Sequence, residues 1–276
     1  MPNTSRRSNN RGKYSGSRKK GRRKVYRKRS KAPFFLAVAG ILLIGAVVAI
    51  WKYNPGNIVD QAAELLNIED AKSAVKVVHK KRVVLNVPLI NQMDDPKLYN
   101  GCEVTSLAMV LNYNGIDVTK SELADNIETV PFQYDNGEHG NPNDGFVGSV
   151  SGSTSTGLGV YHGPIYKLAK QYADNVYDLT GSNFDTVVNK VEEGHPVWTI
   201  TTTAFAPVSD FESWDTPDGE IDVTYSEHSV CITGFDRNKR VIYVNDPYGY
   251  KNREVDWNDF AAAYKQMGKQ AVYVTK

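Results

Sequence analysis

One cysteine of this chain stands where a thiol could act as a nucleophile. Cys102 opens the segment "CEVTSLAMVLNY", in which helical spacing joins the apolar residues Val104, Leu107, Ala108 and Leu111. The unpaired N–H groups and the dipole at the start of a helix stabilise a thiolate, which is the reactive form of cysteine. The same N–H groups can bind the oxyanion that forms when a carbonyl group is attacked. The position of Cys102 therefore suits covalent catalysis, although a cysteine near a helix start is often a plain core residue, so the residues around it must decide.

A disulfide and a metal site are the alternatives for this thiol. The only other cysteine, Cys231, lies in the β-branched run "SVCITGF", which is typical of a buried free cysteine, although a Cys102–Cys231 disulfide stays open for an exported domain. A metal site needs three or four ligands at workable spacing. Two cysteines 129 residues apart and five scattered histidines do not supply it. We therefore expect neither a metal nor a cofactor.

A nucleophile needs a base, and the base needs an orienting group. His228 heads the predicted strand "HSVCITGFD", and Asp246 ends the next one, "VIYVND". If the hairpin between them centres on Asn238, Asp246 pairs with Val230 and lies on the same face as His228, two residues along the strand. Such diagonal neighbours are roughly 7–8 Å apart at the backbone, within reach of a carboxylate and an imidazole. A register shifted by one residue would place them on opposite faces.

The elements that must position these residues are mainly helices early in the domain and mainly strands late in it. A strand is predicted over 83–89, followed by the Cys102 helix and by a helix that Thr119 and Glu122 open as a capping box. A long Gly-, Ser- and Asn-rich loop covers 131–163, and further helices are predicted at 164–172, 184–193 and after Asp256. The runs "HPVWTITTTA" and "QAVYVTK" complete an antiparallel sheet with the two strands above. Helices first and an antiparallel sheet afterwards indicate an α+β fold.

Charge is distributed unevenly along the 276 residues. Residues 1–31 carry 14 Lys and Arg and no acid, whereas the rest of the chain carries 19 basic and 31 acidic side chains. Between the basic tail, 1–32, and the acidic part lies "PFFLAVAGILLIGAVVAIW", 19 residues without a charge. A helix of that length rises about 28 Å, close to the hydrocarbon thickness of a bilayer. We therefore predict one transmembrane helix over 33–53.

The basic residues fix the expected orientation, because Lys and Arg beside a span stay on the cytoplasmic side. The tail is then cytoplasmic, and a stalk over 54–82 and a domain over 83–276 lie outside the membrane. A cleaved signal peptide is the alternative, since "VVA" at 47–49 resembles a cleavage site. The tail is expected to contact anionic lipid. No nucleic-acid partner is expected.

Six segments in order resemble the bacterial cysteine peptidases related to the double-glycine peptidase that processes bacteriocin precursors. They are "VPLINQ", "GCEVTSLAMVLNYNG", "NPNDGFVGS", "GLGVYHGPI", "EHSVCITGFD" and "VIYVNDPYG", and they span roughly 83–276. The resemblance implies a papain-like fold, in which helices that carry the cysteine pack on an antiparallel sheet that carries the histidine and aspartate.

The resemblance also implies a role for each candidate site residue. Cys102 matches the nucleophile, His228 the general base and acid, Asp246 the orienting carboxylate, and Gln92 the side chain of the oxyanion hole. A neutral amide donor just upstream of the cysteine suits that last role. The sequence departs from the family at Glu103, where many relatives have Gly, and an inward-pointing acid there would oppose a thiolate. It also has no transporter, so cleavage after a double glycine is not expected.

The sequence thus predicts a bacterial cysteine peptidase that is anchored in the membrane by a single pass, has its catalytic domain outside, and acts on a peptide or protein. One alternative has the same chemistry: a cell-wall peptidase of the NlpC type, which cuts peptidoglycan stem peptides. Another belongs to a different class: a non-catalytic binding or scaffold domain on the same fold, with the loop over 131–163 as its contact surface.

Overall fold

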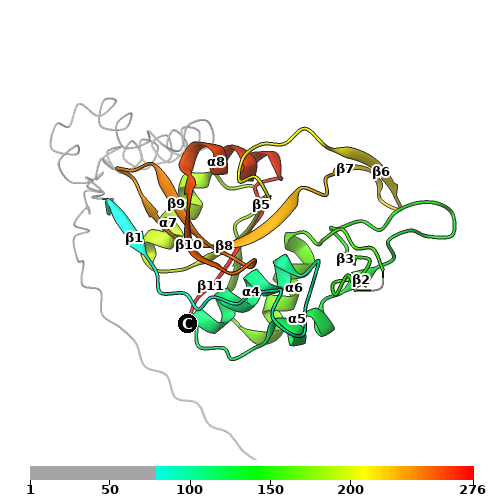
Figure 1. Cartoon of the computed structure of the whole chain (residues 1–276), viewed down its shortest axis with the longest axis horizontal. Coiled ribbons are helices and arrows are strands. Elements are labelled where there is room, and N and C mark those ends of the chain that lie inside the picture. Colours follow the sequence, from blue (N-terminus) through cyan, green and yellow to red (C-terminus); the bar gives the residue numbers. More distant parts are fainter. Residues whose placement is uncertain (1–78, 154) are drawn as a thin grey trace, which may run out of the picture. The chain divides into compact units, whose positions relative to one another are not determined.

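An antiparallel sheet organises the part of the chain that the computed structural model describes, residues 79–153 and 155–276 (Figure 1). These residues belong to a compact unit, Val78–Lys276. The predicted basic tail, the predicted transmembrane helix and nearly all of the predicted stalk lie outside the described residues. Within the described part, no helix combines the length and the apolar character that a membrane crossing requires.

The sheet has seven strands in the described residues. Its strand order is β10-β9-β8-β5-β11-β4, and β1 pairs with the last residues of β8. Every pairing in it is antiparallel. The strands are β1 (Arg82–Val84), β4 (Val176–Asp178), β5 (Val197–Thr202), β8 (Glu227–Asp236), β9 (Val241–Asp246), β10 (Tyr250–Asp256) and β11 (Ala271–Val274).

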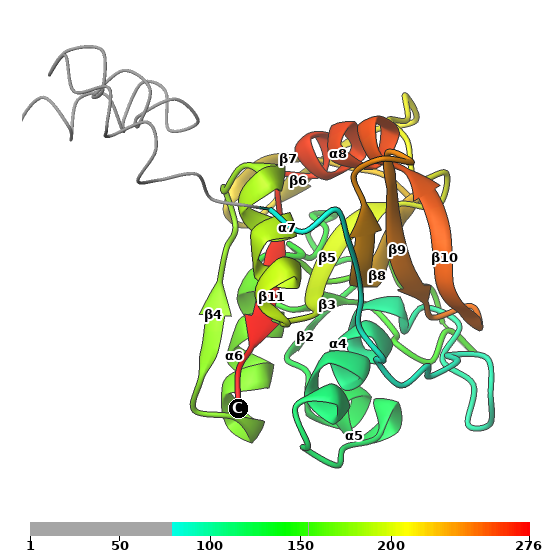
Figure 2. The same ribbon diagram turned by 90° about the vertical axis from the view of Figure 1, so that its left-hand side faces the viewer.

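Helices pack on both faces of this sheet, with one hydrophobic cluster on each side. One cluster joins the sheet to α4 (Cys102–Tyr113), α5 (Lys120–Asn126) and α6 (His162–Tyr172). The other joins it to α7 (Phe184–Glu193) and α8 (Trp257–Gln266). In Figure 2, α4 and α5 lie below the sheet and α8 lies above it. Helices packed on an antiparallel sheet confirm the predicted α+β class.

Helix α4 is buried along most of its length. Every residue from Glu103 to Leu111 is inaccessible to solvent, so the helix lies in the core rather than on its surface. Two hydrogen bonds fix its first turns to neighbouring strands. The indole N–H of Trp198 donates to the Glu103 carbonyl (3.0 Å), and the Ser106 hydroxyl donates to the Ser229 carbonyl (3.1 Å). The N-terminus of α4 is thereby held against the start of β8.

The region predicted as one long loop contains short elements. β2 (Thr129–Val130) and β3 (Phe146–Val147) form a two-stranded parallel sheet. The ring of His139 stacks on Trp214 at 4.1 Å between centroids. Trp214 belongs to a hairpin of β6 (Glu212–Thr216) and β7 (Gly219–Val223), which the sequence did not predict. Phe132 and His139 of this region therefore dock on the hairpin through Trp214.

Strands β8 and β9 carry the register on which the sequence prediction for His228 and Asp246 depends. Cys231 pairs with Asn245, which is the predicted register, so the prediction is confirmed at this end of the hairpin. Beyond a bulge between Ile232 and Gly234 the pairing shifts by one residue, so the predicted centre of the turn is wrong. A bulge adds one unpaired residue to one strand and thereby changes the register across it.

Lys120 fixes the loop that precedes α4. Its side chain is only 6% exposed, and its ammonium group donates to the carbonyls of Asn91 (2.8 Å), Gln92 (2.9 Å) and Asp94 (2.6 Å). Burial lowers the pKa of Lys120, while the charges of Asp94 and Asp95 oppose that shift. One buried cation from α5 therefore joins three backbone carbonyls of this loop, of which those of Asn91 and Gln92 also accept from N–H groups within the loop.

Lys120→Met is expected to lower the free energy of unfolding by about 1–3 kcal/mol, because it removes three hydrogen bonds from a cation and leaves the Asp94 carbonyl without its donor. Urea denaturation followed by tryptophan fluorescence measures this loss. Lys167→Met is the matched control, since the Lys167 side chain is 68% exposed, and its effect should stay below about 0.5 kcal/mol. Equal effects of the two substitutions would contradict the role given to Lys120.

Candidate functional site

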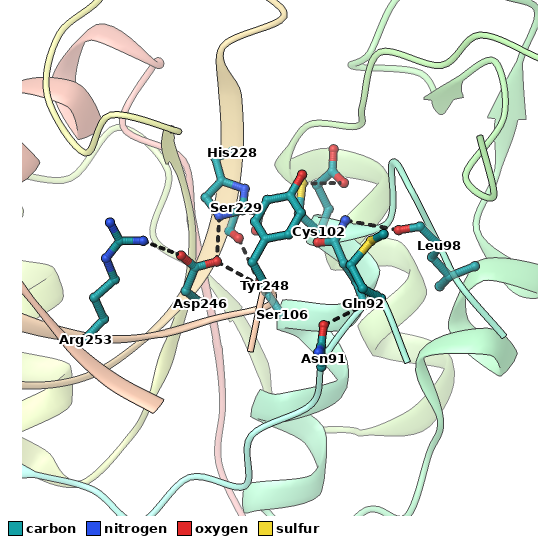
Figure 3. A network of polar contacts seen from close by, with 12 residues as sticks. Asn91, Gln92, Leu98, Cys102, Ser106, His228, Ser229, Asp246, Tyr248 and Arg253 are labelled. Carbon is teal, nitrogen blue, oxygen red and sulfur yellow. Dashed lines mark hydrogen bonds and ion pairs between the residues drawn. The ribbon is translucent and has the colours of Figure 1, made fainter. Parts of the chain in front are cut away.

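His228 and Asp246 meet at the ends of two neighbouring strands. The imidazole Nε2 of His228, at the start of β8, lies 3.0 Å from Oδ1 of Asp246, at the end of β9 (Figure 3). Both side chains are almost fully buried. The predicted partners are therefore hydrogen-bonded in the structure, and the second ring nitrogen of His228 is left for another partner.

Asp246 is held by more than the histidine. The backbone N–H of Tyr248 donates to Oδ1 (3.0 Å), and the Arg253 guanidinium donates to Oδ2 (3.0 Å). Burial alone would raise the pKa of Asp246, but the hydrogen bonds from His228, Tyr248 and Arg253 together lower it. The group is therefore an anion near neutral pH, and this anion can orient and stabilise an imidazolium.

Cys102 lies at the N-terminus of α4, as predicted. Its Sγ donates to Oε2 of Glu103 at 3.2 Å. The backbone of Ser229, the residue after His228, lies near the thiol and favours its ionised form. The structure contains no hydrogen bond between Cys102 and His228 in its described part. The thiol therefore lies beside the start of β8, with its proton directed to Glu103.

The electrostatic surroundings of Cys102 differ from the sequence expectation. Burial raises the pKa of the thiol well above its usual value, and the charges of Glu103 and Glu227 raise it further. A helix N-terminus contributes about 0.3–2 kcal/mol to an anion, which is less than the cost of removing a charge from water. The thiol is therefore protonated in this arrangement, and an imidazolium partner is needed to form the thiolate.

Gln92 lies in the loop between β1 and α4. Its backbone N–H donates to the carbonyl of Pro247, directly after Asp246 (2.7 Å), so the loop is joined to the end of β9. Its side-chain amide donates to the carbonyls of Leu98 (3.0 Å) and Tyr99 (3.3 Å). The amide oxygen is buried and has no hydrogen-bond partner among the residues that the structure describes. The side chain is thus close to the segment that leads into Cys102, with its N–H groups bonded to that segment.

The start of α4 retains free hydrogen-bond donors. Gly101 is the N-cap residue, and no side chain caps the helix there. A Cβ at Gly101 would approach the Leu98 Cβ to 2.5 Å, so only glycine fits this close turn. The first N–H groups of the helix, including that of Cys102, are consequently available to an oxyanion.

A cavity of about 330 Å³ adjoins His228 and Asp246. The ring of Tyr248 stacks on the ring of His228, at 5.4 Å between centroids and 25° between planes. The other lining residues are Thr203, Tyr250 and Arg253. None of these was predicted from the sequence, although "DPYGYKNR" directly follows the predicted strand and is rich in aromatic and polar side chains. Aromatic and polar side chains therefore line the cavity beside His228.

The two cysteines are free, and Cys231 is fully buried in β8. Burial raises the pKa of the Cys231 thiol. The described residues contain no group of three or more His, Cys, Asp or Glu side chains suited to a metal ion. Cys231 is therefore an inert core residue and serves as an internal reference for Cys102.

Known proteins resemble this chain over the region that carries the site. The uncharacterized protein YvpB of Bacillus subtilis is 54% identical over 209 residues, which cover 75% of this chain and 82% of that protein. The crystal structure of a proposed C39-like peptidase from Bacillus anthracis is 43% identical, covers 71% of this chain and 98% of its own, and superposes with a TM-score of 0.68.

The family model named Peptidase_C39 like family matches residues 84–272, which include Gln92, Cys102, His228 and Asp246. This range contains every strand from β4 to β10 and all five helices that build the two cores. Because the match covers more than half of the chain, and because the relatives share its sequence over most of their length, the chain belongs to the Peptidase_C39 like family.

Proposed function

We propose that this protein is a cysteine peptidase that hydrolyses peptide bonds with Cys102 as its nucleophile. The hydrogen bond between His228 and Asp246 at 3.0 Å is the observation that carries this proposal. It places the proton of the imidazole on Nε2, so Nδ1 is the acceptor for the thiol proton. In the proposed reaction the thiol turns from Glu103 toward the imidazole.

The proposed reaction proceeds through an acyl-enzyme. His228 removes the thiol proton, and the Cys102 thiolate attacks the carbonyl carbon of the peptide bond. The N–H of Cys102 and the amide of Gln92 stabilise the oxyanion, and the imidazolium protonates the leaving amine. Water, activated by the same imidazole, then releases the acid product and restores the thiol. Asp246 keeps the imidazole in the required tautomer throughout.

Gln92 must change its partners to fill this role. Its amide N–H groups are bonded to Leu98 and Tyr99, so substrate binding has to redirect at least one of them toward the oxyanion. The contact between the Gln92 backbone and Pro247 keeps the side chain near the histidine and aspartate strands. Lys120 holds the same loop from the other side.

Cys102→Ala is expected to lower peptide hydrolysis by at least about 10³-fold, because the acyl-enzyme can no longer form. Cleavage of a mixed peptide pool, read as new termini by mass spectrometry, measures the activity. Cys231→Ala is the matched control and should retain it. Full activity of the Cys102→Ala protein would exclude the proposal.

A thiol-directed alkylating probe separates this function from the alternatives. A peptidase is labelled at Cys102 and not at Cys231, whereas a binding domain leaves both thiols unreactive at neutral pH. Release of soluble muropeptides from purified cell wall, without cleavage of the peptide pool, would instead favour the NlpC-type activity.

Gln92→Met is expected to lower kcat by about 10²–10³-fold while the rate of Cys102 alkylation stays within roughly threefold. Alkylation forms no oxyanion, so it does not need the amide donor. Asn91→Ala, which changes the neighbouring amide, is the control for loop disturbance. A parallel loss of alkylation and hydrolysis would show that Gln92 only supports the fold.

The chain is further proposed to be anchored in the membrane by residues 33–53, with the catalytic domain on the outer side. The uncharged stretch and the 14 basic residues before it support this proposal. The acidic composition of the remaining chain suits a domain that has no contact with anionic lipid.

Leu43→Arg combined with Val47→Arg should release the full-length protein from membranes, because each Arg at the centre of a span costs about 2.5–3.5 kcal/mol. Alkaline extraction followed by sedimentation measures the membrane-bound fraction. The control pair Leu43→Val and Val47→Leu keeps the apolar character and should remain bound. A wild-type protein that alkaline extraction releases would contradict the anchor.

A further inference from the structure

Two buried glutamates flank the candidate catalytic residues. Glu103 directly follows Cys102 on α4, and Glu227 directly precedes His228 on β8. Glu103 is 1% exposed and Glu227 is 9% exposed. Neither carboxyl group forms an ion pair with a basic side chain of the described residues. Two acids so deeply buried without a cation need another way to avoid the cost of charge.

The carboxyl groups of Glu103 and Glu227 lie next to each other, because the Oε1 atoms of both approach the same point beside Gly159. Glu103 also accepts from the backbone N–H of Val160 (2.9 Å) and from the Cys102 thiol (3.2 Å). Both carboxyl oxygens of Glu227 are buried without a hydrogen-bond partner among the described residues. Two adjacent buried carboxyl groups avoid mutual repulsion when one of them keeps its proton. Glu103 already accepts two hydrogen bonds, so Glu227 is the better donor and Glu103 the better acceptor.

The backbone closes over the pair at Gly159. A Cβ at this position would lie 2.5 Å from Oε1 of Glu103 and 3.0 Å from Oε1 of Glu227. Only glycine therefore allows the segment before α6 to cover both carboxyl groups, and the cover excludes the water that would otherwise solvate them.

The titratable groups that face the pair are all neutral or acidic. They are Cys102 on α4, Tyr161 before α6 and Tyr248 after β9. Burial raises the pKa of Glu103 to about 7, although the hydrogen bonds it accepts act in the opposite direction. Burial and the charge of Glu103 raise the pKa of Glu227 well above its usual value. Above about pH 7 the pair therefore holds one proton, on Glu227.

We propose that Glu103 and Glu227 share a proton and act as positioning residues, which join the start of α4 to the start of β8. The pair sets the distance between the Cys102 thiol and the His228 imidazole, because each acid is the direct neighbour of one of them in the chain. This inference rests on the proposed peptidase function and adds a reason for an acid after the cysteine. The sequence alone gives such an acid only an unfavourable effect on the thiolate.

The shared proton also makes the site sensitive to pH. Loss of this proton leaves two adjacent buried carboxylates, which repel each other and separate α4 from β8. The second negative charge also opposes formation of the Cys102 thiolate. Activity is therefore lost as the pH rises through the titration of Glu227.

The test compares Glu227→Gln with Glu227→Ala in the full-length protein. A glutamine side chain still donates a hydrogen bond to Glu103 but has no proton to lose. Glu227→Gln should keep kcat at neutral pH within about threefold of wild type, and the alkaline limb of its pH profile should move to higher pH. Glu227→Ala should lower kcat by about 10²-fold, as expected for a misplaced reacting group, with KM changed less than roughly threefold.

Glu128→Gln is the matched control, because the Glu128 side chain is 65% exposed. It should change neither kcat nor the alkaline limb of the pH profile. Equal losses in Glu227→Gln and Glu227→Ala would overturn the proposal, since rescue by the amide is its central expectation. An unchanged alkaline limb in Glu227→Gln would overturn it as well.

Two readouts do not depend on activity, so failure of this proposal is distinguishable from failure of the peptidase function. The carbonyl band of a protonated carboxyl group in the infrared spectrum at neutral pH should be present in wild type and absent in Glu227→Gln. A wild-type protein without that band has no shared proton.

The melting temperature provides the second readout. Both carboxyl groups have a raised pKa in the folded chain, so their contribution to stability is complete below the ordinary value of 4.5 and is lost as pH rises through the raised values. The wild-type melting temperature should therefore fall between about pH 5 and 8 more steeply than that of Glu227→Gln. Parallel slopes would contradict the shared proton.

Discussion

The hydrogen bond between His228 and Asp246 forms only if strands β8 and β9 keep the same register, without a shift of even one residue. Side chains alternate along a strand, so a slip of one position would move Asp246 to the other face of the sheet. The pairing of Cys231 with Asn245 sets the required alternation next to the site. The bulge between Ile232 and Gly234 separates this pairing from the different register near the turn. The orientation of the candidate base therefore depends on a local irregularity about five residues away.

Two opposing electrostatic effects decide whether the Cys102 thiol at the start of α4 is ionised. The start of a helix favours an anion, and this is the property that makes Cys102 a candidate nucleophile in the sequence. The same burial that fixes the helix between the strands removes water from the thiol and from Glu103, and it raises the pKa of both groups. Desolvation exceeds the helix contribution, so the resting thiol is protonated. The proposed reactivity of Cys102 then depends on the imidazole and not on the helix alone.

Much of the framework could be predicted from local patterns. The apolar period of α4 and the β-branched runs of β5, β8, β9 and β11 are strong signals, because core-facing segments have little freedom in composition. The hairpin β6–β7 was missed, since "ESWDTPDGEIDV" is rich in acids and its apolar face is formed by few residues. Strand β10 was missed for a similar reason, as "YKNREVD" is polar and mostly exposed at the edge of the sheet.

The sequence by itself determined which residues are candidates for nucleophilic catalysis: a thiol at a helix start, and an imidazole and a carboxylate at the ends of successive strands. Only the tertiary structure decided how they are surrounded. Arg253, Tyr248 and Glu227 reach the site through the bulged register and the close approach at Gly159, and no local pattern encodes these features. Residue type and period are local properties, whereas burial and the resulting pKa shifts depend on which distant segments exclude water from the same place.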